Sequence, residues 1–227
     1  MNKKKIIFFV DTRWFGALKN TQLLRKRLLD NNYQIYIFGQ KDELFSQFET
    51  KDVHLHTLRI RSSYFSFYSD ILDILKLIFF IIKIRPKAIH AFNPKPIFIS
   101  FFSVLLFFNI KFFTSQTGTG NLFSKNKFLI PIIFILFKRI NKKSSAIFFY
   151  NKFDSEMFLK KKIIDKNKIV FVGPYVDINQ FILKGEKPKK EIMRIICISR
   201  LLKQKGVIEF IEVAKKYKLD NNDISVE

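Results

Sequence analysis

Short apolar runs that alternate with helix-like segments constrain the fold of this chain more than any other feature. The first run, at residues 5–10, is apolar throughout after its lysine. Similar runs lie at residues 33–38, 53–58, 87–92, 111–115, 145–150, 168–172 and 192–198, and helical periodicity occurs at 15–31, 66–83, 96–108, 128–139, 152–161 and 207–216. Strands buried on both faces are typical of parallel sheets covered by helices. The sequence therefore predicts an α/β fold with a Rossmann-like, doubly wound parallel sheet.

A polar segment divides the predicted elements into two groups. Residues 184–191, KGEKPKKE, contain no large apolar side chain, which is typical of a linker. We therefore predict an N-terminal Rossmann-like domain over residues 1–183, a linker over 184–191 and the start of a second domain over 192–227. The second group holds one strand and one helix, too little to bury a core of its own.

The charge of the chain points to an anionic partner. Of the 227 residues, 41 are Lys or Arg and 19 are Asp or Glu, which gives a formal net charge of +22. Nucleic acid, a lipid surface and phosphorylated ligands are the candidate classes. An AT-rich coding sequence, which favours Lys, Ile, Phe and Asn, is a second explanation for part of the excess. No nucleic-acid-binding motif is present, so we expect no nucleic-acid partner.

Cysteine and histidine are scarce, which limits metal and disulfide chemistry. Cys197 is the only cysteine, and the three histidines are His54, His56 and His90. These counts exclude a disulfide scaffold and argue against a zinc site, so we expect no metal and no cofactor.

No segment is predicted to span a membrane. The longest uncharged stretch, residues 96–110, has fifteen residues, whereas a spanning helix needs about 20. The N-terminal apolar run is also shorter than the ~7–15 residues of a signal peptide. We expect a cytoplasmic protein. The apolar segments flanked by Lys and Arg have two interpretations, core helices or helices that dock on an anionic bilayer at the inner face of the membrane.

The strongest candidate site is ICISRLLKQKG, residues 196–206. A strand ends, a basic turn follows and a helix begins, so Arg200 and Lys205 would lie where α/β domains bind phosphate. Arginine offers a planar fork to phosphate oxygens and lysine a point charge. A basic loop without a ligand is the alternative interpretation.

Three further loops follow predicted strands. Gly118 and Gly120 lie in TSQTGTGNLF, and Gly16 ends DTRWFG after the first strand. In IHAFNPKPIFIS, Asn93 and Lys95 lie just past a strand and could bind a ligand or anion. None of these loops has the spacing of a standard phosphate-binding motif.

We expect His90, within its apolar strand, to be a core residue. No nucleophile–base pattern such as G-x-S-x-G is present. The catalytic residues are therefore not assigned from the sequence.

Taken together, these segments resemble the retaining family 4 glycosyltransferases, in particular those that build envelope polysaccharides and lipid-linked glycans. The stretches HAFNPKP and RLLKQKG carry the resemblance most specifically. It implies a GT-B fold whose N-terminal domain takes the acceptor and whose C-terminal domain holds a nucleotide sugar, for which we expect a UDP-sugar. It also implies hexosyl or N-acetylhexosaminyl transfer to a lipid-linked or cell-envelope glycan acceptor, without a metal.

The resemblance also implies roles for single residues. Arg200 and Lys205 match the residues that bind the donor diphosphate. Gly16 matches approximately the glycine loop that approaches the donor, and the glycine-rich loop falls on Gly118 and Gly120, whose amides could contact donor or acceptor.

The sequence departs from the family in ways that bear on activity. Gln116 and Thr117 stand where a histidine often lies near the reacting sugar, and Tyr175 stands where a glycine usually precedes Val-Asp. The donor-binding glutamate pair of the family would lie beyond residue 227. We therefore expect the isolated chain to be inactive. The alternative is a non-catalytic basic α/β module that binds an anionic membrane or a partner chain.

Overall fold

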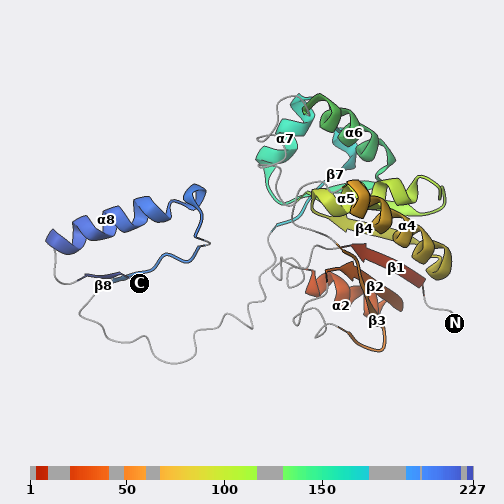
Figure 1. The fold of residues 1–227 in the computed structure, drawn as a ribbon, viewed down its shortest axis with the longest axis horizontal. Helices are drawn as coiled ribbons and strands as arrows, with labels where there is room; N and C mark the ends of the chain where they lie inside the picture. Colours follow the sequence, from red (N-terminus) through yellow and green to blue (C-terminus); the bar gives the residue numbers. More distant parts are fainter. Residues whose placement is uncertain are drawn as a thin grey trace. The chain divides into compact units, whose positions relative to one another are not determined.

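A computed structural model describes residues 4–9, 21–40, 49–59, 67–116, 130–173, 193–199, 201–220 and 224–226. The chain forms two compact units, Met1–Val176 and Asp177–Glu227 (Figure 1). The predicted linker and the predicted domain boundary lie outside the described residues, so both stay predictions.

The first unit is built on a seven-stranded parallel sheet. Its strands are β1 (Lys4–Phe9), β2 (Tyr33–Gly39), β3 (Val53–Thr57), β4 (Ala88–Phe92), β5 (Lys111–Gln116), β6 (Ala146–Phe149) and β7 (Ile169–Phe171). They lie in the order β3-β2-β1-β4-β5-β6-β7, and every neighbouring pair is parallel. The predicted Rossmann-like α/β architecture is confirmed.

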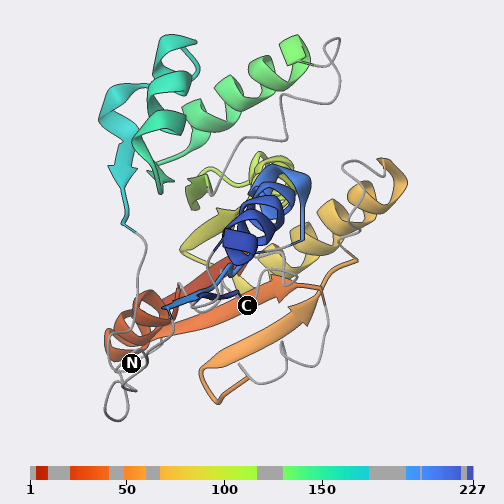
Figure 2. The ribbon, with the colours of Figure 1, turned by 90° about the vertical axis from the view of Figure 1, so that its left-hand side faces the viewer.

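Helices cover the sheet on both faces. On one face lie α4 (Phe67–Ile84), α5 (Pro94–Val104), α6 (Ile130–Lys143) and α7 (Lys152–Lys160), and α2 (Gln22–Asp30) packs on the other. Figure 2 shows α5 between α4 and α6. The larger core lies under α4–α7 and includes Ile89, Phe112 and Phe137, all without exposed surface. Because the central strands β1, β2 and β4 have apolar side chains on both sides, both helical layers are required to exclude water.

Residues in the first turn explain where two of the helices, α6 and α7, begin. Pro131 lies in the first turn of α6, a position where the missing N–H of proline costs nothing. At α7 the side-chain oxygen of Asn151 accepts a hydrogen bond from the amide of Asp154 at 2.7 Å. The side-chain Nδ2 of Asn151 in turn donates to the Asp154 carboxylate at 2.8 Å, so these two residues close the first turn from both directions.

The second unit is described as β8 (Met193–Ile195), a short 3₁₀ turn η3 (Lys203–Lys205), α8 (Val207–Asp220) and β9 (Ile224–Val226). Strands β8 and β9 pair in parallel. The strand predicted at 192–198 is shorter in the structure, where three described residues, Met193–Ile195, pair with β9. Cys197 therefore lies past the strand rather than within it.

No described helix combines the length and apolar character that crossing a membrane would require.

The packing under α6 predicts the effect of a core substitution. Phe137 is fully buried, and its ring packs edge-on against Phe98 and Phe158 at centroid distances of 5.2 and 5.6 Å. Phe137→Ala should lower the free energy of unfolding by about 3–5 kcal/mol, measured by urea unfolding. The control Phe153→Ala, on α7 at a side chain that is 76% exposed, should cost less than about 1 kcal/mol. Equal losses would contradict the described core.

Candidate functional site

The strand order reverses between β1 and β4, and in open α/β sheets a ligand-binding crevice forms at such a reversal. From β1 the chain continues to β2 on one side, and from β4 it continues to β5 on the other. Ligands of open α/β sheets bind at this reversal, beyond the carboxyl ends of the strands. Residues 10–20 after β1, including Gly16, lie outside the described residues, as do Gly118 and Gly120. The described side of the crevice is therefore formed by residues that follow β4 and end β5.

Asn93 occupies a strained backbone conformation at this edge. Its φ is +67° and its ψ is +153°, a combination that is essentially restricted to glycine. Pro94 follows and disfavours helical ψ values for the residue before it, which opposes relaxation of Asn93 into the left-handed helical region. The Asn93 amide donates to the carbonyl of Ser115 at 3.3 Å, and its carbonyl accepts from the amide of Ile97 at 3.0 Å. These bonds join β5 to the first turn of α5.

The start of α5 is poorly suited to bind an anion through its amides. Pro94 and Pro96 have no backbone N–H, and the amide of Ile97 is already bonded to Asn93. A helix N-terminus binds phosphate through exposed N–H groups. At α5 most of these donors are absent or used.

Lys95 forms an ion pair within the unit. Its Nζ lies 2.8 Å from Oδ1 of Asp70 in the first turn of α4, and the two side chains are 14% and 15% exposed. An incoming phosphate would have to compete with this carboxylate for the Lys95 charge. The pair also fixes the start of α4 to the start of α5.

A series of hydrogen-bonded polar side chains lies on the sheet face that α2 covers. Nε2 of His90 in β4 is 2.8 Å from Oγ of Ser115 in β5, and Ser115 also hydrogen-bonds Tyr150 just after β6. The imidazole ring of His90 stacks on the ring of Phe92, with 4.2 Å between the ring centroids. Complete desolvation lowers the pKa of His90 to about 3. The imidazole is therefore neutral near pH 7, and a base this weak is poorly matched to general base catalysis.

Gln116 ends β5 with an unsatisfied carboxamide. The side chain is fully buried, and within the part of the chain that the structure describes neither its nitrogen nor its oxygen has a hydrogen-bond partner. Gln116 pairs in register with Phe149, on the sheet face covered by α5, α6 and α7. Leaving a buried amide unpaired costs about 1–3 kcal/mol. A carboxamide offers two N–H donors and an acceptor oxygen, which suits a ligand that carries hydroxyl groups.

The sequence predicts that two residues of the basic turn, Arg200 and Lys205, bind phosphate. Arg200 lies outside the described residues, so the structure places Lys205 alone of the two. Lys205 ends η3 and is exposed. Gly206 follows at φ +69°, a left-handed conformation that leads into α8. The carbonyl of Gly206 then accepts from the amide of Phe210 at 2.9 Å. The predicted succession of strand, basic turn and helix is present.

No group of three or more His, Cys, Asp or Glu side chains suited to a metal ion occurs in the described residues. The sequence identified Asn93 and Lys95 as candidate ligand-binding residues. It indicated neither the strained backbone of Asn93 nor the ion pair between Lys95 and Asp70. It noted Gln116 only as a departure from the family.

Comparisons with known proteins identify the fold. No protein-family model and no curated protein matches the sequence. A glycosyltransferase from Rickettsia africae ESF-5 matches with a TM-score of 0.70 and 16% identity over 100% of this chain and 68% of its own. Sucrose-phosphate synthase from Thermosynechococcus elongatus matches with a TM-score of 0.63 and 10% identity over 99% and 70% of the two chains. S. aureus MnaA, in a co-structure with UDP, matches with a TM-score of 0.60 and 14% identity over 100% and 62%.

This chain thus spans between 62% and 70% of the length of these three structures. At these identities the matches show the fold, which is GT-B-like and Rossmann-like.

The buried state of His90 predicts a pH-dependent stability. Because the folded state holds the pKa of His90 at about 3, the unfolded state, with a pKa near 6.5, binds the proton first. The contribution of His90 is complete above pH ~6.5 and is lost as pH falls from there towards 3. Lowering the pH to about 5 should therefore cost about 2 kcal/mol through His90 alone.

Urea unfolding at several pH values checks this expectation. His90→Asn, which does not titrate, should show a flatter decrease between pH ~6.5 and ~5 than the unmodified chain. Parallel curves for the two proteins would contradict the burial of a neutral imidazole.

The conformation of Asn93 predicts that glycine is better tolerated there than asparagine. Asn93→Gly should raise the free energy of unfolding by about 1 kcal/mol, because relief of about 1–3 kcal/mol of backbone strain exceeds the added entropy of the unfolded chain. Asn93→Ala keeps the strain and should not stabilise. Thermal unfolding of both variants distinguishes them, and destabilisation by glycine would refute the strained conformation.

Proposed function

We propose that this chain carries the acceptor side and the start of the donor side of a nucleotide-sugar-dependent glycosyltransferase. The observation that carries the proposal is the basic turn of Lys203–Lys205, which opens α8 after strand β8. The stretch RLLKQKG, the most specific part of the family resemblance, lies across this turn. Cationic side chains beside a helix N-terminus can hold a diphosphate and offset the charge of the leaving group.

In the proposed reaction the acceptor hydroxyl oxygen forms a bond to the anomeric carbon of the donor sugar. The bond between that carbon and the diphosphate oxygen breaks, the nucleoside diphosphate leaves with the bonding electrons, and the proton of the acceptor hydroxyl passes to the departing diphosphate or to water. We propose Arg200 and Lys205 as diphosphate ligands, with retention of configuration and a UDP-sugar as the donor. No metal is required where cationic side chains supply the positive charge.

The first unit suits an uncharged, hydroxyl-bearing acceptor group. Gln116 supplies a carboxamide that has no hydrogen-bond partner among the described residues, Asn93 follows the neighbouring strand, and the Lys95 charge is paired with Asp70. These features favour recognition of sugar hydroxyls over recognition of a phosphate at this part of the crevice. We propose a lipid-linked or cell-envelope saccharide as the acceptor, used at the inner face of the membrane.

Binding is a sharper test of this proposal than turnover. The family resemblance implies donor contacts that these 227 residues do not contain, so we propose that the isolated chain does not turn over. A non-catalytic basic α/β module is the second candidate, and it predicts no affinity for a nucleoside diphosphate.

Removal of the Lys205 charge should weaken donor binding. Lys205→Ala should reduce the affinity for UDP about tenfold or more, because a charge-assisted contact to phosphate is lost. Isothermal titration calorimetry measures the effect. Lys215→Ala, an exposed lysine in the second half of α8, is the matched control and should leave the affinity unchanged. The same affinity in both variants, or no binding of UDP by the chain, would count against the donor role of the turn.

A further inference from the structure

Helix α4 has two apolar faces, and among the described residues one of them packs into the core. Leu77, Ile81 and Ile84 are buried against the sheet and α5. A second stripe faces solvent and consists of Tyr68, Leu72, Leu75, Phe79 and Ile82, with exposed fractions between 44% and 77%. Their spacing of three or four residues places them along one side of the helix. A helix that is apolar on its solvent side indicates a partner outside the fold.

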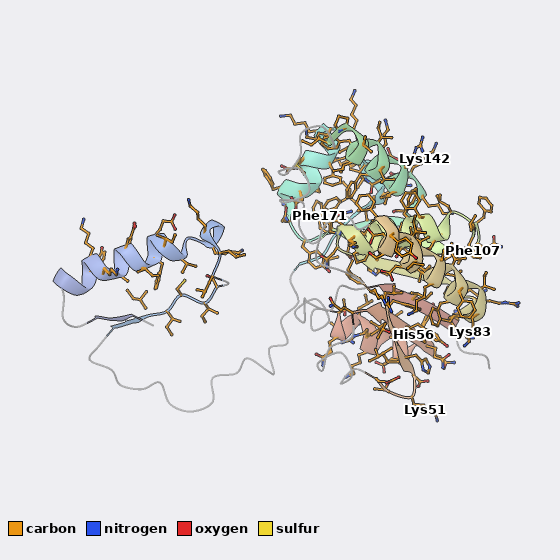
Figure 3. The ribbon with its side chains drawn as sticks, in the orientation of Figure 1. Lys51, His56, Lys83, Phe107, Lys142 and Phe171 are labelled. Atoms are coloured by element: carbon orange, nitrogen blue, oxygen red, sulfur yellow. The ribbon has the colours of Figure 1, made fainter. Side chains whose placement is uncertain are left out.

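The neighbouring elements extend this exposed apolar character. The connection from α5 to β5 exposes Leu105, Leu106 and Phe108, the last at 88%. On α6, Ile132 and Ile135 are exposed along the same side as the basic residues nearer its C-terminus. Figure 3 shows Lys83, Phe107 and Lys142, from α4, the α5–β5 connection and α6, along one side of the first unit.

Basic side chains accompany these apolar groups. The exposed cations are Lys83 at the end of α4, Lys111 at the start of β5, and Lys138, Arg139 and Lys142 on α6. Lys143 lies 5.4 Å from the ring centroid of Phe108, which ties the end of α6 to the α5–β5 connection. We call these cations, the α4 stripe, the three side chains of the α5–β5 connection and the two α6 isoleucines the docking surface.

The charge of this region has a single sign. Residues 74–153 contain no aspartate or glutamate, while they hold Lys or Arg at positions 76, 83, 85, 87, 95, 111, 125, 127, 138, 139, 142, 143 and 152. The two acidic residues of α4, Asp70 and Asp73, precede this stretch. Asp70 is paired with Lys95, and Asp73 accepts from the amide of Arg59 at 3.1 Å. The charge pattern therefore complements an anionic surface without local repulsion.

We propose that the docking surface binds the anionic head groups and the adjoining hydrocarbon of a lipid bilayer. Exposed aliphatic and phenylalanine side chains gain free energy by entering the hydrocarbon boundary, and lysine and arginine contact lipid phosphates from the same side. A nucleic acid would match the charge but not the aliphatic side chains. With 18 residues, α4 is about 27 Å long and can lie in the plane of the interface.

The cationic end of this surface lies away from the candidate site. Lys83, Lys111 and the α5–β5 connection lie at the amino ends of the strands, whereas Asn93, Lys95 and Gln116 lie at the carboxyl ends. The α4 stripe runs from there towards the site, because Tyr68 and Leu72 flank Asp70, which pairs with Lys95. A vesicle-binding assay contains no donor or acceptor sugar, so its outcome is independent of the proposed glycosyl transfer.

Flotation of the full 227-residue chain with lipid vesicles tests the proposal. Vesicles of phosphatidylcholine with phosphatidylglycerol should bind the chain, and vesicles of phosphatidylcholine alone should bind it at least tenfold more weakly, since several cations each contribute about fivefold. Raising the salt from about 0.1 M to about 1 M should reduce binding to the anionic vesicles, because the Debye length falls from about 10 to 3 Å. Equal binding to both vesicles, or none, would overturn the proposal.

A matched pair of charge variants locates the binding surface. Lys138→Gln with Arg139→Gln removes two exposed cations from α6, and Lys26→Gln with Arg27→Gln removes an exposed Lys-Arg pair from α2 on the other face of the sheet. The α6 variant should lower vesicle affinity about tenfold or more, and the α2 variant should change it much less. Equal losses would show that only the net charge matters and would refute the surface.

A second pair tests the apolar contribution. Phe108→Ser should lower affinity for anionic vesicles about tenfold, since one exposed phenylalanine no longer enters the hydrocarbon. Phe153→Ser, at a similarly exposed phenylalanine on α7, should have little effect. Circular dichroism of both variants checks that they fold. Unchanged binding by Phe108→Ser, or binding to soluble polyglutamate as tight as binding to vesicles, would overturn a bilayer as the partner.

Discussion

The parallel register of the seven strands is the constraint on which the rest of the first unit depends. It brings the carboxyl ends of all seven strands to the same edge of the sheet, and the direction of the strand order reverses between β1 and β4. It also requires helices on both faces, because the strands are apolar on both sides. Open α/β sheets bind ligands past the carboxyl ends of their strands. Here the strained Asn93 follows β4, and Gln116, whose carboxamide has no hydrogen-bond partner in the described part of the chain, ends β5.

The two ends of the strands in the first unit differ in the charge of the side chains around them. Near the crevice, Lys95 is paired with Asp70, and desolvation keeps the pKa of His90 near 3, so the imidazole is neutral. Exposed positive charge gathers instead around the ends of α4 and α6 and the start of β5, beside exposed apolar side chains. The net charge of +22 is thus less informative than its distribution. Recognition of a sugar hydroxyl and attachment to a lipid surface can use different parts of one unit without competing.

The elements of the first unit could be predicted from the sequence, but their ends could not. The helix predicted at 96–108 ends at Val104, and the one predicted at 128–139 continues to Lys143. In the second case Lys168, distant in sequence, donates to the carbonyls of Asn141 and Lys142 at 3.0 and 2.8 Å. These carbonyls have no partner within their own helix, and a lysine at the C-terminus satisfies them. Strand β9, only three residues long, had no pattern strong enough to predict it.

By itself, the sequence determined the α/β class, the parallel sheet, and the basic turn between β8 and α8. Apolar runs and their period report which sides of an element avoid water, and that is enough to choose this architecture. Only the tertiary structure decided that Lys95 pairs with Asp70, that Ser115 meets His90, and that the outer stripe of α4 is left uncovered. Periodicity describes one element at a time. Pairing and exposure depend on neighbours that the chain brings together only when it folds.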